Sequence, residues 1–96
     1  MRRVERVAQL ANGLSPLDAI TRLKAAVSAI PNIWTDMPPE VNLLDLKAEG
    51  PQISVRPYTH TDHCWQVYFD TNEAILRVCT EAGWPTPAIT QIHRAV

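Results

Sequence analysis

The sequence predicts an α+β domain with a ferredoxin-like β-α-β-β-α-β fold, in which two helices pack on one face of a small sheet. Segments 16–30 and 62–82 repeat apolar residues at helical spacing, and both carry their apolar residues on one side. Between them, segments 41–46 and 53–56 are typical of two strands joined by a turn. The chain has 96 residues, which is enough for one hydrophobic core but not for two.

The first strand is expected over residues 2–11, where Val4, Val7, Ala8 and Leu10 alternate imperfectly with charged residues. The imperfect alternation leaves open which face of this strand is buried. Asn12-Gly13 ends it, because both residue types favour turns.

A helix is expected to follow, with Ser15 as its N-cap, Pro16 at its first position and Asp18 in its first turn. Pro31 disfavours helical geometry in the residue before it and ends the helix nearby. The prolines of residues 31–39 predict a loop. The inward face of the helix is predicted to consist of Leu17, Ile20, Leu23, Val27 and Ile30.

The two middle strands are expected to form an antiparallel hairpin that turns at residues 49–51, Glu-Gly-Pro. In the first strand, 41–46, the alternation changes phase between Leu43 and Leu44. This phase change predicts either a β-bulge or a strand buried on both faces. The second strand, 53–56, alternates cleanly and is typical of a half-buried strand.

The second helix is expected to begin at a cap formed by Thr59 or Asp62 and to end at Gly83, the residue type that most readily adopts the left-handed conformation. Residues 89–96 are predicted to form a last strand or arm. The inward stripe of the helix is predicted to contain Trp65, Tyr68, Ile75, Cys79 and Ala82, with Cys64 and Leu76 at its margins. Tyr68 and Ile75 are therefore expected in the core.

Composition argues against several classes of protein. The net charge is -1 and the only basic cluster is Arg2-Arg3, so the stripe of cations that a nucleic-acid surface requires is missing. No apolar run approaches the roughly 18–20 residues of a membrane span. The first residues do not resemble a signal peptide, which predicts a cytoplasmic location. Cys64 and Cys79 fall in one predicted helix, about 22 Å apart, which is too far for a disulfide.

His60, His63 and Cys64 form the one cluster that suggests chemistry. One interpretation is a zinc or copper site completed by His93. The other is a polar helix start with Cys64 turned inward, and it is favoured because no second Cys/His pair stands at finger-like spacing.

Catalysis is not predicted either. Adjacent helical residues point about 100° apart, so His63 is poorly placed to activate Cys64 as a nucleophile. Asp62, Asp70 and Glu73 are interpreted as solvated residues, with Glu73 and Arg77 expected to form an ion pair. With three glycines, the chain has no phosphate-binding loop. We therefore predict no enzyme and no catalytic, cofactor-binding or metal residue.

The order of several motifs along the chain is more specific than composition. Residues 53–58 (ISVRPY) are followed by residues 65–75 (WQVYFDTNEAI), then by Ala82-Gly83 and a proline-containing segment. This order resembles the C-terminal cytoplasmic domain of MscS-type mechanosensitive channels, over nearly the whole chain. In that family a V-R strand leads through a polar turn into a helix with a V-Y-aromatic-D pattern, which ends at A-G.

The resemblance implies a structural role. The family's cytoplasmic domains assemble as a ring, usually sevenfold, into a vestibule below a pore that releases ions on osmotic shock. It implies that the chain is part of a longer channel of the bacterial inner membrane, with transmembrane helices and a middle β-domain as further partners. Residues 1–87 would form the cytoplasmic domain, and residues 88–96 a strand or arm that pairs weakly within it.

Two alternatives remain open at this point. The first is a free-standing ferredoxin-like domain that binds a ligand and regulates, which requires a deep pocket at a strand–helix junction. The second is a small hydrolase, whose anion cradle would have to use Arg56 and Asn72. Fold alone does not decide among the three.

Overall fold

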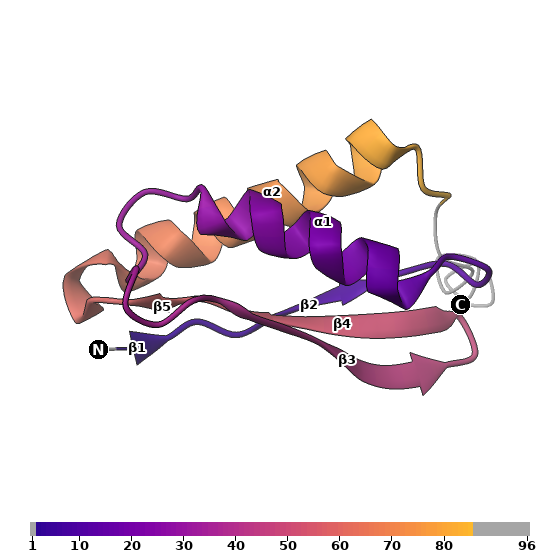
Figure 1. Cartoon of the computed structure of the whole chain (residues 1–96), viewed down its shortest axis with the longest axis horizontal. Coiled ribbons are helices and arrows are strands. Elements are labelled where there is room, and N and C mark those ends of the chain that lie inside the picture. Colours follow the sequence, from indigo (N-terminus) through magenta and orange to yellow (C-terminus); the bar gives the residue numbers. More distant parts are fainter. Residues whose placement is uncertain (1, 86–96) are drawn as a thin grey trace, which may run out of the picture.

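The computed structural model describes residues 2–85 and contains two helices that lie on one face of antiparallel strands (Figure 1). This confirms the predicted α+β fold class; the predicted last strand, 89–96, lies outside the described residues. In chain order the elements are β1 (Arg2–Arg3), β2 (Arg6–Gln9), α1 (Pro16–Ser28), β3 (Glu40–Lys47), β4 (Gly50–Arg56), β5 (Tyr58–Thr59), the 3-10 turn η1 (Thr61–His63) and α2 (Cys64–Ala82).

The strand predicted over residues 2–11 is divided into β1 and β2. β2 pairs with β4 in a three-stranded sheet of order β2-β4-β3, whereas β1 pairs with β5. The division follows from Pro57, which separates β4 from β5 and has no N–H to donate to a sheet. Its carbonyl accepts a hydrogen bond from the N–H of Val4 at 2.9 Å, so the two chains stay together across the break.

The hairpin of β3 and β4 is antiparallel, as predicted, and the predicted bulge is confirmed. Leu43 pairs with Ile53 and the next pair is Asp45 with Gln52, which leaves Leu44 as the extra residue. The turn lies at residues 48–49, slightly earlier than expected, so Gly50 already belongs to β4.

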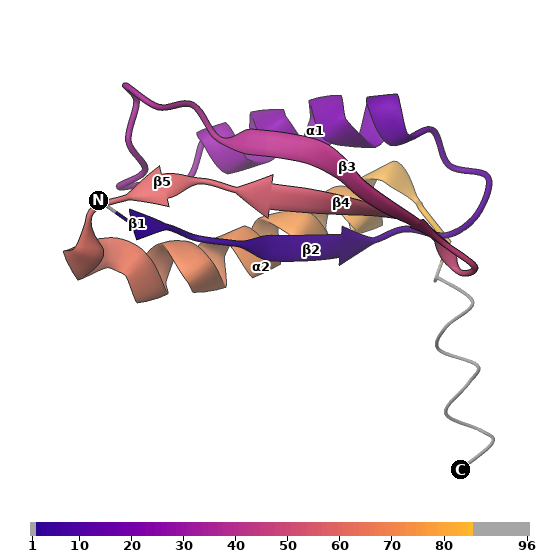
Figure 2. The ribbon, with the colours of Figure 1, turned by 90° about the horizontal axis from the view of Figure 1, so that it is seen from below.

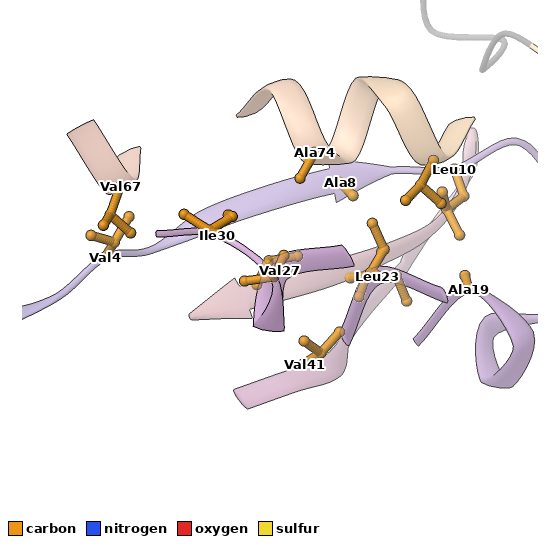
Figure 3. Close-up of a cluster of buried hydrophobic side chains, with 13 residues drawn as sticks. Val4, Ala8, Leu10, Ala19, Leu23, Val27, Ile30, Val41, Val67 and Ala74 are labelled. Carbon is orange, nitrogen blue, oxygen red and sulfur yellow. The ribbon is translucent and has the colours of Figure 1, made fainter. Parts of the chain in front are cut away.

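Both helices pack their buried residues against the sheet to form one core (Figure 3). α1 lies nearest β3 and β4, whereas α2 contacts β2. The buried apolar side chains of this core are Val4, Ala8, Leu10, Ala19, Leu23, Val27, Ile30, Val41, Ile53, Val55, Val67, Ala74 and Val78. Of the inward residues predicted for the first helix, Leu23 and Val27 are buried on α1 and Ile30 is buried just after it. Ile20 is half-buried, and the prediction is wrong for Leu17, which is 77% exposed.

The inward stripe predicted for α2 is wrong in its phase. The buried residues are Val67, Thr71, Ala74 and Val78, whereas Trp65 and Leu76 are exposed. The predicted core residues Tyr68 and Ile75 are half-buried beside the core, and so are Cys64, Cys79 and Ala82. The inner face of α2 is therefore formed by small and β-branched residues. Thr71 can be buried there because its hydroxyl donates to the carbonyl of Val67 at 2.7 Å.

Two of the three predicted caps are correct, those at Ser15 and Gly83. Ser15 accepts a hydrogen bond from the N–H of Asp18 at 3.3 Å, and Gly83 ends α2 with φ 69°. The cap predicted at Thr59 or Asp62 is wrong, because η1 precedes α2 and His60 caps it by accepting from the N–H of Asp62. Thr59 is buried instead and donates to the carbonyl of Asn32 at 2.8 Å.

Candidate functional site: two exposed apolar flanks

The outer side of α2 carries large apolar residues that face solvent. Trp65, Phe69 and Leu76 are 69%, 57% and 67% exposed. Their spacing of four and seven residues places them along one side of the helix, and we call this stripe the α2 flank. The rings of Trp65 and Phe69 are stacked with centroids 5.9 Å apart, so the two side chains form one surface.

Tyr68 anchors this aromatic surface to the sheet. Its ring contacts those of Trp65 and Phe69 edge-on, with centroid distances of 5.4 and 5.6 Å. The guanidinium of Arg6, on β2, lies 4.4 Å from the centroid of the Tyr68 ring and donates to the side chain of Asn72 at 2.8 Å. The aromatic side chains are therefore held in place before any partner binds.

A second apolar surface lies on β3, an edge strand of the three-stranded sheet. Leu43, Leu44 and Leu46 are 45%, 46% and 70% exposed, and we call them the β3 flank. Charged residues border the β3 flank at its C-terminal end. There the N–H of Leu46 donates to Asp45 and Lys47 forms an ion pair with it at 3.3 Å, and both contacts lower the pKa of Asp45.

The two flanks lie on opposite sides of the domain. β2 and β3 are the two edges of the sheet, α2 contacts β2, and α1 contacts β3 (Figure 2). Monomeric proteins rarely leave large contiguous apolar patches exposed, and an open edge strand is a site for association. The domain thus presents exposed apolar surfaces on two sides.

The residues that suggested a metal site do not form one within the part of the chain that the structure describes. His60 and His63 are exposed at the start of α2, and the Nδ1 atom of His60 lies 3.6 Å from the carboxylate of Asp62. Among residues 2–85, no group of three His, Cys, Asp or Glu side chains is arranged to hold a metal ion. His93 lies outside the described residues.

The two residues considered for an anion cradle are held apart. Arg6 pairs directly with Val55 across the sheet, so Arg6 shares a face with Val55 and with Asn72 above it. Arg56 alternates with Val55, projects from the other face and forms an ion pair with Glu5 at 3.4 Å. Arg56 and Asn72 therefore cannot hold one anion between them.

Two further expectations concern the surface of α2. The predicted ion pair between Glu73 and Arg77 is not among those of the described residues, whereas α1 has a pair of this kind between Asp18 and Arg22 at 2.9 Å. Cys64 and Cys79 are free thiols. Partial burial raises the pKa of the Cys79 thiol, because desolvation disfavours the thiolate.

A cavity of about 330 Å³ lies where the end of β2 meets the last turns of α2. Its apolar lining includes Leu10, Leu14, Leu76 and Trp84, and it extends to Pro85, the last described residue. It has the position that a ligand-binding regulator would need, but it brings together no cluster of charged groups.

Comparison with known families supports one of these possibilities. The family model described as "Mechanosensitive ion channel MscS, C-terminal" matches residues 14–85. The chain belongs to this family. No curated protein matches the chain. The MscS match covers α1, the β3–β4 hairpin and α2, so both apolar flanks lie within it.

Membership in the MscS family accounts for the motifs on which the resemblance is based. The V-R strand is the end of β4 and the V-Y-F-D segment lies in α2, as the resemblance implied. None of the helices among residues 2–85 combines the length and the apolar character needed to cross a membrane. The chain is thus a C-terminal domain of a channel family, whose helices are of the amphipathic kind that covers a sheet.

Proposed function

We propose that this chain is the cytoplasmic vestibule domain of a mechanosensitive ion channel, and that it serves structure and subunit assembly during ion efflux on osmotic shock. The observation that carries the proposal is the family match over both helices and the hairpin. The exposed leucines and aromatic residues of the two flanks support it, since a domain that works in an assembly keeps such surfaces for its neighbours.

The partners in this proposal are further copies of the chain, in a ring of seven, together with the transmembrane helices and the middle β-domain of the channel. The domain would lie on the cytoplasmic side of the bacterial inner membrane. It would not act on nucleic acid, because Arg2-Arg3 is its only basic cluster. It would have no enzymatic activity and no cofactor, in keeping with a family of ion channels.

We also propose that residues 1–87 form the domain and that residues 88–96 serve as a C-terminal strand or arm. Two features support this boundary. The buried apolar residues of the described part lie between Val4 and Val78, and α2 ends at Gly83. The arm would contribute to contacts between subunits in the assembled channel.

A chimeric channel tests the proposed function. The C-terminal domain of a characterised MscS channel is replaced by this chain, and the chimera is expressed in a bacterial strain without mechanosensitive channels. We expect the cells to survive a sudden drop in osmolarity as well as cells with the intact parent channel. A matched chimera with Leu23→Asp, which places a charge in the core, should not protect them. A chimera that reaches the membrane in normal amount and gives no protection would contradict the proposal.

A further inference from the structure

We propose that the α2 flank of one copy docks against the β3 flank of the next copy, so that identical domains join head to tail. This inference rests on the proposed function and adds to it the two surfaces that meet. Its occupant is a second copy of this chain.

A closed ring of more than two subunits has a geometric requirement. Each subunit must present two different, complementary surfaces, because the contact is heterologous and repeats by rotation. The α2 and β3 flanks differ in structure, one being a helix side and the other a strand edge. They also lie at opposite sides of the domain (Figure 2), as such a contact requires.

The apolar residues of the two flanks run in the same direction along the domain. On β3, Glu40 pairs with Arg56, close to β5, whereas Leu46 pairs with Pro51 at the opposite end of β4. On α2, Trp65 lies just after β5 and η1, at the same end as Glu40. Leu76 lies near Leu10, whose N–H donates a hydrogen bond to the carbonyl of Pro51, at the same end as Leu46. Copies related by rotation therefore place Phe69 near the level of Leu43 and Leu44, and Leu76 near the level of Leu46.

Charge favours the same pairing. Arg2 and Arg3 line a cavity together with Trp65, at the start of the α2 flank. Asp36 and Glu40 line another cavity at the start of β3, at the same end of the domain, and outnumber the one cation there, Lys24. The two arginines and the two carboxylates take part in none of the ion pairs found among the described residues. Joining the flanks head to tail brings the two arginines of one copy toward the two carboxylates of the next, which favours this register.

Covering β3 also removes a liability. Among residues 2–85, no strand pairs with the outer edge of β3, which lies beside exposed leucines, and this combination promotes uncontrolled edge-to-edge pairing. A helix laid over the edge protects it without extending the sheet. The aromatic side chains suit this task, because stacked rings offer a large rigid surface that loses little freedom on binding.

Disulfide trapping tests the contact directly. In a chain carrying Cys64→Ala and Cys79→Ala, Phe69→Cys is introduced in one sample, Leu44→Cys in a second, and both in a third. The proteins are concentrated and oxidised with copper phenanthroline. We expect a mixture of the two single variants to form a heterodimer, and the double variant to form a ladder of trimers and larger species.

The single variants alone supply the contrast, because a head-to-tail contact brings Phe69 to Leu44 and not to another Phe69. Ala25→Cys, on the exposed outer side of α1, is the matched control partner for Leu44→Cys and should give little product. Dominant 69–69 dimers would indicate two-fold packing of α2 on α2, and dominant 44–44 dimers would indicate edge-to-edge pairing of β3. Either result, or the absence of any product from the mixture, would overturn the proposal.

A charge exchange provides an independent measurement in the chain with its own cysteines. Arg3→Glu and Glu40→Arg should each weaken self-association about two- to fivefold, the range for an exposed ion pair. The doubly exchanged chain should recover it, since the pair is restored with reversed sign. Sedimentation velocity measures all three. If self-association does not recover in the double variant, Arg3 of one copy and Glu40 of the next do not meet.

The outcomes also separate this inference from the proposed function. If the chimeric channel protects cells but residues 69 and 44 do not crosslink, the channel role stands and the contact lies elsewhere. If the chain crosslinks as expected but the chimera gives no protection, the contact stands and the channel role fails.

Discussion

Leu17 and Leu23 lie on the same helix but in opposite environments. Leu23 is fully buried against the sheet, whereas Leu17 is 77% exposed in the first turn of α1. Leu23→Ala should therefore lower the free energy of unfolding by about 2–5 kcal/mol, because it removes buried methyl groups and leaves a cavity. Leu17→Ala should change it by less than about 0.5 kcal/mol. Urea unfolding of both variants measures the difference, and equal losses would mean that the face of α1 is assigned wrongly.

Cys79 should behave as a poorly ionised thiol. Burial raises its pKa above the usual value of a cysteine, so its thiolate fraction at a given pH is smaller in the folded chain. In a chain with Cys64→Ser, the rate of alkylation by iodoacetamide should rise at a higher pH than it does for a cysteine in an unstructured peptide. The same shift favours folding below the pKa of the unfolded chain, and this contribution is lost as the pH rises through the folded pKa. A midpoint at or below that of the peptide would contradict the assignment.

The sequence predicts that α2 is amphipathic but not which side faces inward. The helix has apolar residues on both sides: Val67, Ala74 and Val78 on one, and Trp65, Phe69 and Leu76 on the other. The prediction from the sequence places the aromatic residues Trp65 and Tyr68 inside. The structure places small and β-branched residues there instead. Side-chain volume at the interface between elements, which periodicity does not contain, decides the phase.

At the scale of the elements, Gly50 joins the hairpin to the end of the first strand. Its φ is +141°, and a β-carbon there would collide with the carbonyl oxygen of Leu10 and lie 2.6 Å from the carbonyl carbon of Ala11. Both contacts are with backbone, which cannot move aside like the tip of a side chain. Gly50→Ala should therefore cost much more stability than an ordinary glycine substitution.

Gly83 is the matched control for this prediction. Its φ is also positive, at 69°, but a β-carbon would meet no atom within 4 Å, so Gly83→Ala should cost about 1–2 kcal/mol from conformation alone. Thermal unfolding of the two variants should show a loss for Gly50→Ala at least twice as large. Similar losses would mean that the close approach of β4 to Leu10 is not important for stability.

Elements that depend on local chemistry are predicted well, and elements that depend on distant residues are not. The Ser15 cap, the bulge at Leu44 and the end of α2 at Gly83 each follow from neighbours within a few residues. The break between β1 and β2 does not, because Pro57 imposes it from the partner strand. The cap expected at Thr59 fails for a related reason, since the Thr59 hydroxyl is bound to the loop at Asn32.

At the scale of the whole molecule, the sequence identifies the family, but it does not identify the two flanks that are proposed to form the contact between copies. The V-R and V-Y-F-D motifs keep their order along the chain, which a family comparison detects. The α2 flank is not predicted from the sequence, because Trp65 is expected in the inward stripe of the helix and Leu76 at its margin. If the two flanks are covered by neighbours, the surfaces left free include the open sheet face, with its Glu5–Arg56 pair, and the outer side of α1, with its Asp18–Arg22 pair. Both carry charged residues, as surfaces in contact with water should.

The last prediction concerns the proposed boundary of the domain. The core of the described residues is formed by elements between Val4 and Val78, so stability should not depend on residues 88–96. Their deletion should shift the melting temperature of the dilute chain by less than about 4 °C, which corresponds to under 1 kcal/mol for a domain of this size. In the chimeric channel the same deletion should reduce assembly, measured as the fraction of crosslinked oligomer in membranes. Leu23→Ala supplies the contrast, since it should lower the melting temperature clearly. A comparably large fall on deletion would show that residues 88–96 are an integral strand of the domain and that the boundary is misplaced.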